Sequence, residues 1–307
     1  MVNTVPDPAH EQPAGEGLAD EGLADKGTCD GNPAEKGPVD EGPVDAIGRR
    51  HAVAGDNARI VSLVPSLTEL LVDLGLSQQL VGRTGFCIHP REVVRAIPKV
   101  GGTKDVKLDE IRRLKASHVI VNVDENRRED ADALIDMGVQ VIATHPQTPE
   151  DNRALYALLG SIFARDQEAA RLTGGLDDAL AIDAAAGAPD PVRVLYLIWR
   201  DPWMSVSADT YVANMLRLGG MEVVAANARD RYPVIADHEP AWQRADAVLL
   251  ASEPYPFREK HLKEVQEAVG GAGKTVRLVD GELLSWYGSR AIAGIRYARQ
   301  LGSELQA

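Results

Sequence analysis

Residues 149–187 read PEDNRALYALLGSIFARDQEAARLTGGLDDALAIDAAAG, a long stretch of almost purely helical pattern in a chain that otherwise alternates strands with helices. Pro149 stands at a first-turn position, where proline fits a helix. Gly160 and the pair Gly174 and Gly175 weaken the pattern because glycine disfavours helix interiors, so one break is expected. The stretch therefore predicts a rigid helical linker between two lobes, with limited motion of one lobe against the other.

Strand signals precede the linker. The run ARIVSLVP at residues 58–65 is rich in branched apolar residues and ends at a proline, which is typical of a buried strand. Ser66 and Glu69 then have the spacing of a capping box, and Gly75 ends the apolar helix that follows. The same cycle of strand and helix recurs up to residue 147, which predicts a parallel sheet with helices on its faces.

After the linker the strand signals return in VRVLYLIW, MEVVA, AVLLAS and TVRLVD, with helix-like segments between them. The chain is thus expected to have an α/β fold in which two Rossmann-like lobes with mainly parallel sheets are joined by a long backbone helix. The expected divisions are a first lobe over residues 58–147, the helical linker over residues 148–189 and a second lobe over residues 190–307.

Residues 1–57 differ in composition from the rest of the chain. They contain the small tandem duplications GEGLADEGLADKG and KGPVDEGPVD and are rich in Gly, Pro, Asp and Glu. Such a segment has too little apolar surface to offset the entropy of ordering, so a disordered tail is expected.

Charge and composition exclude several classes of partner. The net charge of −13 at pH 7 would repel phosphate backbones, so nucleic acid is not an expected partner. No apolar run approaches the roughly 20 residues that span a bilayer, so membrane insertion is not expected either. The two cysteines, Cys29 and Cys87, do not predict a disulfide framework, because Cys29 lies in the low-complexity tail.

The two lobes on a backbone helix, opening with RIVSLVPSLTELLVDLG at residues 59–75, resemble the helical-backbone metal-chelate receptors. These are the class III substrate-binding proteins of ABC importers for vitamin B12, ferric siderophores and haem, and the resemblance covers residues 59–305. The segment WRDPWMSVSADTYVANMLRLGG at residues 199–220 is similar to the opening of the second lobe in the cobalamin-binding members. The resemblance implies a receptor, expected as a monomer, that holds a cobalamin-like corrinoid between its lobes, with a ferric-siderophore or haem receptor as the alternative.

The resemblance also implies a periplasmic location and a partner ABC permease, on whose arginines one acidic residue of each lobe would dock. The matching positions are Asp109 or Glu110 in the first lobe and Glu239 in the second. Residues 1–17, however, lack a basic start followed by an apolar stretch, so the chain as it stands would be cytoplasmic. A cytoplasmic corrinoid-handling protein or enzyme is therefore a further alternative, although no GxSxG, HExxH or paired-cysteine motif is present and no catalysis is expected.

Ligands of open α/β sheets bind beyond the carboxyl ends of the strands, so the residues just after each strand are the candidate ligand contacts. Polar first-lobe positions are expected to hydrogen-bond the periphery of the ligand, whereas aromatic second-lobe positions cover its apolar ring surface. Trp203 is the preferred anchor because Pro202 stiffens the turn that presents it, although it could instead be a structural plug between its strand and the next helix. The candidates are Ser66, Arg83, Phe86, His89 and Thr103 in the first lobe, and Trp199, Trp203, Tyr255 and Trp286 in the second.

Cys87 and His89 form a Cys-x-His pair without the second pair that a structural zinc site needs, so no intrinsic metal or cofactor is expected. A buried thiol and a hydrogen-bonded loop histidine account for the pair. The narrower alternative is that His89 lies at the mouth of the cleft and binds the metal centre of the ligand. Glu125 could also meet ligand amides, and Glu253 could act with Asp280 as an acid and a base.

Overall fold

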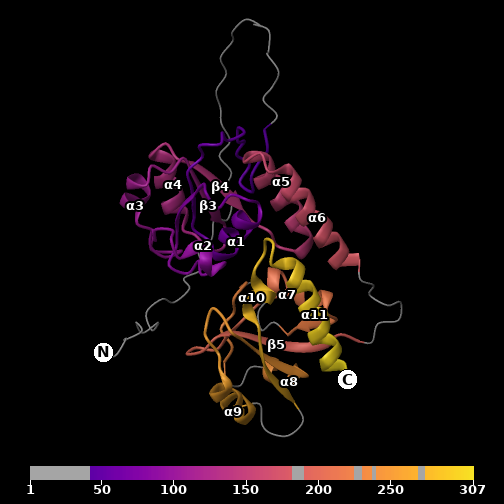
Figure 1. Ribbon diagram of the computed structural model, residues 1–307. Coiled ribbons are helices and arrows are strands. Elements are labelled where there is room, and N and C mark those ends of the chain that lie inside the picture. The colour runs from indigo at the N-terminus through magenta and orange to yellow at the C-terminus, as the bar shows by residue number, and fades with distance from the viewer. Residues whose placement is uncertain (1–41, 182–189, 225–229, 237–239, 269–273) are drawn as a thin grey trace, which may run out of the picture.

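The computed structural model describes residues 42–181, 190–224, 230–236, 240–268 and 274–307. It has two α/β lobes, with the first lobe above the second in Figure 1 and the linker helices along one side. The predicted fold class is confirmed, because each lobe holds a mainly parallel sheet and the segment between the lobes is helical. No helix within these described ranges has both the length and the apolar character needed to cross a membrane.

The sheet of the first lobe has the strand order β2-β1-β3-β4, and all of its strand pairs are parallel. Because parallel strands share one carboxyl edge, the loops that follow the strands lie along the same side of the lobe. The strands are β1 (Ile60–Ser62), β2 (Leu80–Arg83), β3 (His118–Asn122) and β4 (Gln140–Thr144), and the helices are α1 (Pro65–Asp73), α2 (Arg91–Val94), α3 (Leu108–Arg113) and α4 (Arg128–Asp136).

The start of α1 differs from the predicted capping box. The helix begins at Pro65, with Val64 at the N-cap and no side-chain cap, so Ser66 lies inside the helix and is buried. Proline needs no hydrogen-bond acceptor at this position because it has no N–H. Glu69 is left for a different role, which is a two-pronged ion pair with Arg290 of the second lobe.

The linker consists of two helices and not one. A short 3-10 turn (Pro149–Asp151) leads into α5 (Asn152–Ile162), and α6 (Asp166–Ala181) follows. A capping box does occur here, between Thr148 and Asp151, as the first turn begins. The break falls after Gly160, where Ala164 has a φ of 52°, whereas Gly174 and Gly175 lie inside α6.

The second lobe is built around β5, which pairs in parallel with β7 and β8 and antiparallel with β6, while β9 pairs in parallel with β8. Strand β6 is a short antiparallel return at the edge, so the sheet is mainly parallel. The strands are β5 (Val192–Trp199), β6 (Met204–Ser205), β7 (Met221–Val223), β8 (Ala247–Ala251) and β9 (Thr275–Val279), and the helices are α7 (Tyr211–Leu218), α8 (Pro240–Arg244), α9 (Glu259–Ala268), α10 (Gly281–Ser285) and α11 (Ala291–Gln306).

One apolar cluster runs through both lobes and the linker. It joins Leu70 of α1, Tyr156 of α5, Leu216 of α7 and Ile295 of α11, all of which are fully buried. Two further clusters cover the outer faces of the two sheets separately. Because the lobes and linker share a core, moving one lobe against the other would expose apolar surface, which agrees with the limited motion expected from the helical linker.

The N-terminal boundary of the ordered chain is earlier than predicted. Residues 1–41 of the expected tail lie outside the described residues, but residues 42–57 make fixed contacts with the first lobe. Asp45 accepts hydrogen bonds from the backbone N–H groups of Arg49 and Ala143, at 2.9 and 3.1 Å, and pairs with the buried His51 at 3.0 Å. This turn closes over the edge strand β4, so composition alone placed the boundary too late.

The close approach of α5 and α6 at Gly160 gives a first prediction. A Cβ atom on Gly160 would stand 2.6 Å from Cβ of Ala169, whereas a Cβ on Gly174 would meet nothing within 4 Å. We expect Gly160→Ala to lower the free energy of unfolding by about 1–2 kcal/mol, since the two helices must separate. Gly174→Ala is the matched control and should raise it by about 0.5–1 kcal/mol through helix propensity. Urea denaturation measures both, and an equal effect of the two substitutions would contradict the packing described.

Candidate functional site

Residues 286–290, WYGSR, connect α10 to α11 and reach from the second lobe into the first lobe and the linker. The backbone of Gly288 is held by α5 at both of its polar groups. Its N–H donates to Oδ1 of Asn152 at 2.6 Å, and its carbonyl accepts from the Tyr156 hydroxyl at 2.9 Å. Gly288 has a φ of +85° and a side chain here would crowd Ser66 and Leu70 of α1, so glycine is required. The 286–290 segment is therefore fixed against both lobes.

Arg290 closes this segment onto α1. Its guanidinium donates to both carboxylate oxygens of Glu69, at 2.7 and 2.8 Å, and also pairs with Glu282 of α10 at 2.5 Å. It lies over the ring of Trp286, with 4.6 Å between the guanidinium carbon and the ring centroid. Glu282 in turn pairs with His89 of the first lobe at 3.2 Å. Two-pronged arginine–carboxylate contacts fix orientation as well as distance, so the two lobes are held in one register here.

Trp286 and Tyr287 each hold a carboxyl group, one from each lobe. The Trp286 indole N–H donates to Glu253, which follows β8 of the second lobe, and the Tyr287 hydroxyl donates to Glu125, which follows β3 of the first. Burial raises the pKa of Glu125 to about 7, although the hydrogen bond from Tyr287 opposes the rise. Burial also raises the pKa of Glu253 to about 7, and the nearby charges of Glu282 and Glu125 add to it.

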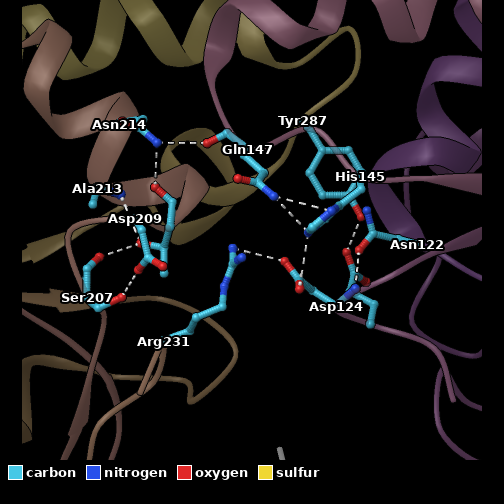
Figure 2. Close-up of polar contacts among 12 residues, drawn as sticks. Asn122, Asp124, His145, Gln147, Ser207, Asp209, Ala213, Asn214, Arg231 and Tyr287 are labelled. Atoms are coloured by element: carbon cyan, nitrogen blue, oxygen red, sulfur yellow. Dashed lines mark hydrogen bonds and ion pairs between the residues drawn. The ribbon is translucent and has the colours of Figure 1, made fainter. Parts of the chain in front are cut away.

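A second bridge between the lobes is visible in Figure 2, where Arg231 of the second lobe points at Asp124 of the first. The two side chains are 3.2 Å apart, and His145 reaches the other oxygen of Asp124 at 3.4 Å. Burial alone would raise the pKa of Asp124, but the hydrogen bond from His145 and the charge of Arg231 lower it below its ordinary value. Asn214 adds a hydrogen bond to the backbone carbonyl of Gln147 at 2.9 Å.

These contacts define an interlobe face, on which the loops after the strands of one lobe meet those of the other. Acidic groups outnumber basic ones on it, and each arginine on it already has a carboxylate partner. The face consists of Glu69, His89, Asp124, Glu125 and His145 from the first lobe and its loops, and of Arg231, Glu253, Glu282, Trp286, Tyr287 and Arg290 from the second.

Three of the candidate residues predicted from the sequence come together on this face. His89 and Trp286 meet edge to face with their ring centroids 5.8 Å apart, although they belong to different lobes. Ser66 lies directly beneath Gly288, and its carbonyl oxygen would be 3.3 Å from a Cβ there. Whether these residues contact a ligand stays a prediction, but their meeting agrees with the rule that sites lie at the carboxyl ends of strands.

The other first-lobe candidates lie farther from the second lobe. Phe86 is 58% exposed and packs beside Gly102, and the carbonyl of Thr103 accepts a hydrogen bond from Asn126 at 2.9 Å. Arg83 is buried and donates to the backbone carbonyls of Val94 and Thr84, at 2.8 and 3.0 Å. Its hydrogen bonds therefore stabilise the loop that carries Phe86 and His89.

The second-lobe aromatic candidates form a cluster of their own, with Trp286 apart from them. Trp203 stacks parallel to Phe257 and meets Trp242 of α8 edge to face, while Trp199 meets Tyr255 edge to face. The cluster packs on the sheet face that carries α8 and α9, and no contact between these rings and the first lobe occurs among the described residues. For Trp203 this geometry favours the structural plug over the ligand anchor.

Several residues of the interlobe face were not candidates from the sequence. Glu69 had been assigned to a helix cap, and Asn152, Arg231 and Arg290 lay in segments predicted only as helix or loop. Their roles depend on partners that are distant in the chain, such as the 221 residues between Glu69 and Arg290. The one usable signal was the WYGSR segment itself, where a glycine follows two aromatic residues just after a strand exit.

Cys87 and His89 do not form a metal site. Cys87 is buried with its sulfur near the hydroxyl groups of Thr68 and Thr84, at 3.0 and 3.1 Å, and burial raises the pKa of its thiol. His89 points instead toward Glu282. Across the described part of the chain, no group of three or more His, Cys, Asp or Glu side chains is arranged to hold a metal ion.

The stacking of Trp203 gives a second prediction. Because its ring packs between Trp242 and Phe257, Trp203→Ala should leave a cavity and lower the free energy of unfolding by about 2–4 kcal/mol. Trp203→Phe keeps a ring in place and should recover at least half of that loss. Thermal melting of the free protein measures the effect. An unchanged melting temperature for Trp203→Ala would instead return Trp203 to the role of a ligand anchor.

Comparison with known proteins agrees with this arrangement. Residues 60–271 match the family model described as "Periplasmic binding protein". A protein of Vibrio parahaemolyticus, named vitamin B12-binding protein, is 25% identical over 181 residues, which are 58% of this chain. The match spans 65% of the length of that relative. A vitamin B12-binding protein of Photorhabdus laumondii is 20% identical over 204 residues, covering 66% of this chain and 73% of that protein.

Solved structures with the same fold include receptors for different ligands. The periplasmic vitamin B12 binding protein BtuF of Vibrio cholerae superposes with a TM-score of 0.68 at 17% identity, over 81% of this chain and 98% of that one. The periplasmic heme binding protein HutB of Vibrio cholerae gives a TM-score of 0.67 at 21% identity, over 82% of this chain and 100% of that one. At such identities the likeness is one of fold alone. The family model nevertheless covers most of the ordered chain, and the protein belongs to the periplasmic binding protein family.

Proposed function

We propose that the protein binds a cobalamin-like corrinoid between its lobes and delivers it to an ABC permease, without catalysing a reaction. The curated relatives at the level of sequence are named vitamin B12-binding proteins, which favours a corrinoid over the other ligands of the fold. The two-lobed architecture and the meeting of strand-exit loops at the interlobe face are what such a receptor requires.

The observation that carries the proposal is the charge balance of the interlobe face. Arg231 is engaged by Asp124, and Arg290 by Glu69 and Glu282, while Glu125 and Glu253 are held only by uncharged donors. A corrinoid presents a rim of carboxamide groups, whose N–H groups donate hydrogen bonds to carboxyl oxygens. The face is therefore rich in the acceptors that such a ligand needs.

The same balance disfavours the alternative ligands. Haem carries two carboxylates and many ferric siderophores are anions, so both would need unengaged arginine or lysine side chains near their acidic groups. Haem would further require a side chain free to bind iron, whereas His89 and His145 are already paired with Glu282 and Asp124. Binding haem here would mean breaking these ion pairs.

Delivery to a permease is the second part of the proposal. Asp109 and Glu110 lie in the first turn of α3 and each pairs with an arginine of its own helix, Arg112 or Arg113. The side chain of Asp109 is 94% exposed, so an arginine of a partner could replace Arg112 at small cost. Glu239, the position expected in the second lobe, lies outside the described residues.

A direct test is the absorption spectrum of the purified protein after incubation with hydroxocobalamin, haem or a ferric siderophore and removal of free ligand by desalting. We expect the corrinoid bands to elute with the protein in a one-to-one ratio, and the haem and siderophore bands to stay in the free fraction. Each ligand passed through the column without protein is the control. Co-elution of haem or siderophore, with the corrinoid left behind, would contradict the proposal.

A further inference from the structure

Glu125 and Glu253 stand out among the acids of the interlobe face because neither has a cationic partner at ion-pair distance in the described ranges. They belong to different lobes, yet adjacent residues of the 286–290 segment hold them: Tyr287 donates to Glu125, and Trp286 donates to Glu253. Both donors are neutral, so they stabilise the carboxyl groups without cancelling a charge. The two carboxyls are close enough for the charge of Glu125 to act on Glu253.

The surroundings of both groups are mainly acidic. Glu125 faces Asp124 on its own loop, Tyr287 from the second lobe and Lys104 from the loop after β2, and Lys104 supplies the one attractive charge. Glu253 faces Glu282 and Asp280 near the start of α10, as well as Glu125 across the interface. The nearest cations on the second-lobe side, His89 and Arg290, are engaged by Glu282.

Charge on these carboxyls therefore opposes closure of the lobes. When both are ionised, two uncompensated negative charges are buried against each other and against Glu282. If the lobes separate, water reaches the carboxyls and the cost of ionisation falls. When the carboxyls are protonated, the hydrogen bonds from Trp286 and Tyr287 remain, because a neutral carboxyl still accepts at its carbonyl oxygen.

We propose that Glu125 and Glu253, held by Tyr287 and Trp286, form a proton-dependent latch between the lobes that closes more firmly as the pH falls below neutrality. The consequence for a bound ligand, slower release at lower pH, rests on the proposed function, whereas the latch itself does not. Ligand retention would thus depend on the pH of the medium in which the receptor operates.

The direction follows from the proton counts of the two states. In the closed form the pKa of each carboxyl is about 7, and on opening it returns toward its ordinary value of 4.5. Between these values the closed form holds protons that the open form releases, so a falling pH favours closure and a rising pH favours opening. For one carboxyl this amounts to a change of at most about 70-fold in the closure equilibrium between pH 8 and pH 5.

Lobe closure can be measured without any ligand. Nitroxide labels would be placed at Asp132→Cys on α4 and Lys263→Cys on α9, both exposed positions, in the full chain carrying Cys29→Ser, since Cys87 is buried. Double electron–electron resonance then gives the distance distribution between the lobes at about pH 5.5 and at about pH 8. We expect the ratio of short to long distances to be roughly tenfold higher at the lower pH.

Substitutions assign the effect to the two carboxyls. Glu125→Gln with Glu253→Gln should give the same distribution at both pH values, because neither residue can then ionise. Glu304→Gln, which alters an exposed acid paired with Arg277, is the matched control and should keep the pH dependence of the parent. If the double variant does not fold, each single variant should lose about half of the logarithmic pH dependence.

Two results would overturn the latch: coincident distributions at both pH values for the parent chain, or an unchanged pH dependence in the glutamine variants. Neither result involves a corrinoid, so the outcome is separate from the proposed function. A latch that responds to pH in a protein that retains no corrinoid would reject the proposed ligand and leave the latch intact. Retention of a corrinoid by a protein without pH-dependent closure would do the reverse.

Discussion

The interlobe arrangement depends on how the backbone of Gly288 is held. Asn152 and Tyr156, one turn apart on α5, bind its N–H and its carbonyl, and its φ of +85° turns the chain so that the neighbouring side chains diverge. From this fixed point Trp286 and Tyr287 reach the strand-exit loops, and Arg290 reaches α1. The linker helix therefore joins the lobes and also positions the segment that contacts both of them.

The ionic groups on the interlobe face are arranged unevenly around this segment. The arginines lie in ion pairs that bridge the lobes, Arg290 to Glu69 and Arg231 to Asp124, while Glu125 and Glu253 have only neutral donors. The paired charges fix register, because guanidinium–carboxylate contacts are directional. The unpaired carboxyls make the same interface sensitive to protons and unattractive to anions. Attachment of the lobes, ligand preference and pH response thus come from one small set of side chains.

The sequence is informative where local pattern decides the outcome and silent where distant partners do. The helical stretch at residues 149–187 and the alternation on either side of it predict the two-lobed fold, because periodicity reflects which faces are buried. The rule of strand exits also places Ser66, His89 and Trp286 correctly at the interface. It cannot distinguish them from Trp203, whose exit loop folds back onto Trp242 and Phe257. Glu69 shows the same limit, since its spacing suits a capping box although its partner is Arg290.

The measurement that tests this account most directly is the hydrogen-exchange rate of the Gly288 amide in the free protein. That N–H is buried and bonded to Asn152 at 2.6 Å, within the core shared by the lobes and the linker. It should therefore exchange about as slowly as the amides of the central strands β5 and β8, through nearly global unfolding, and Asn152→Ala should accelerate it without a comparable effect on those strands. Exchange of the Gly288 amide at the rate of an exposed loop would show that the 286–290 segment does not hold the lobes together.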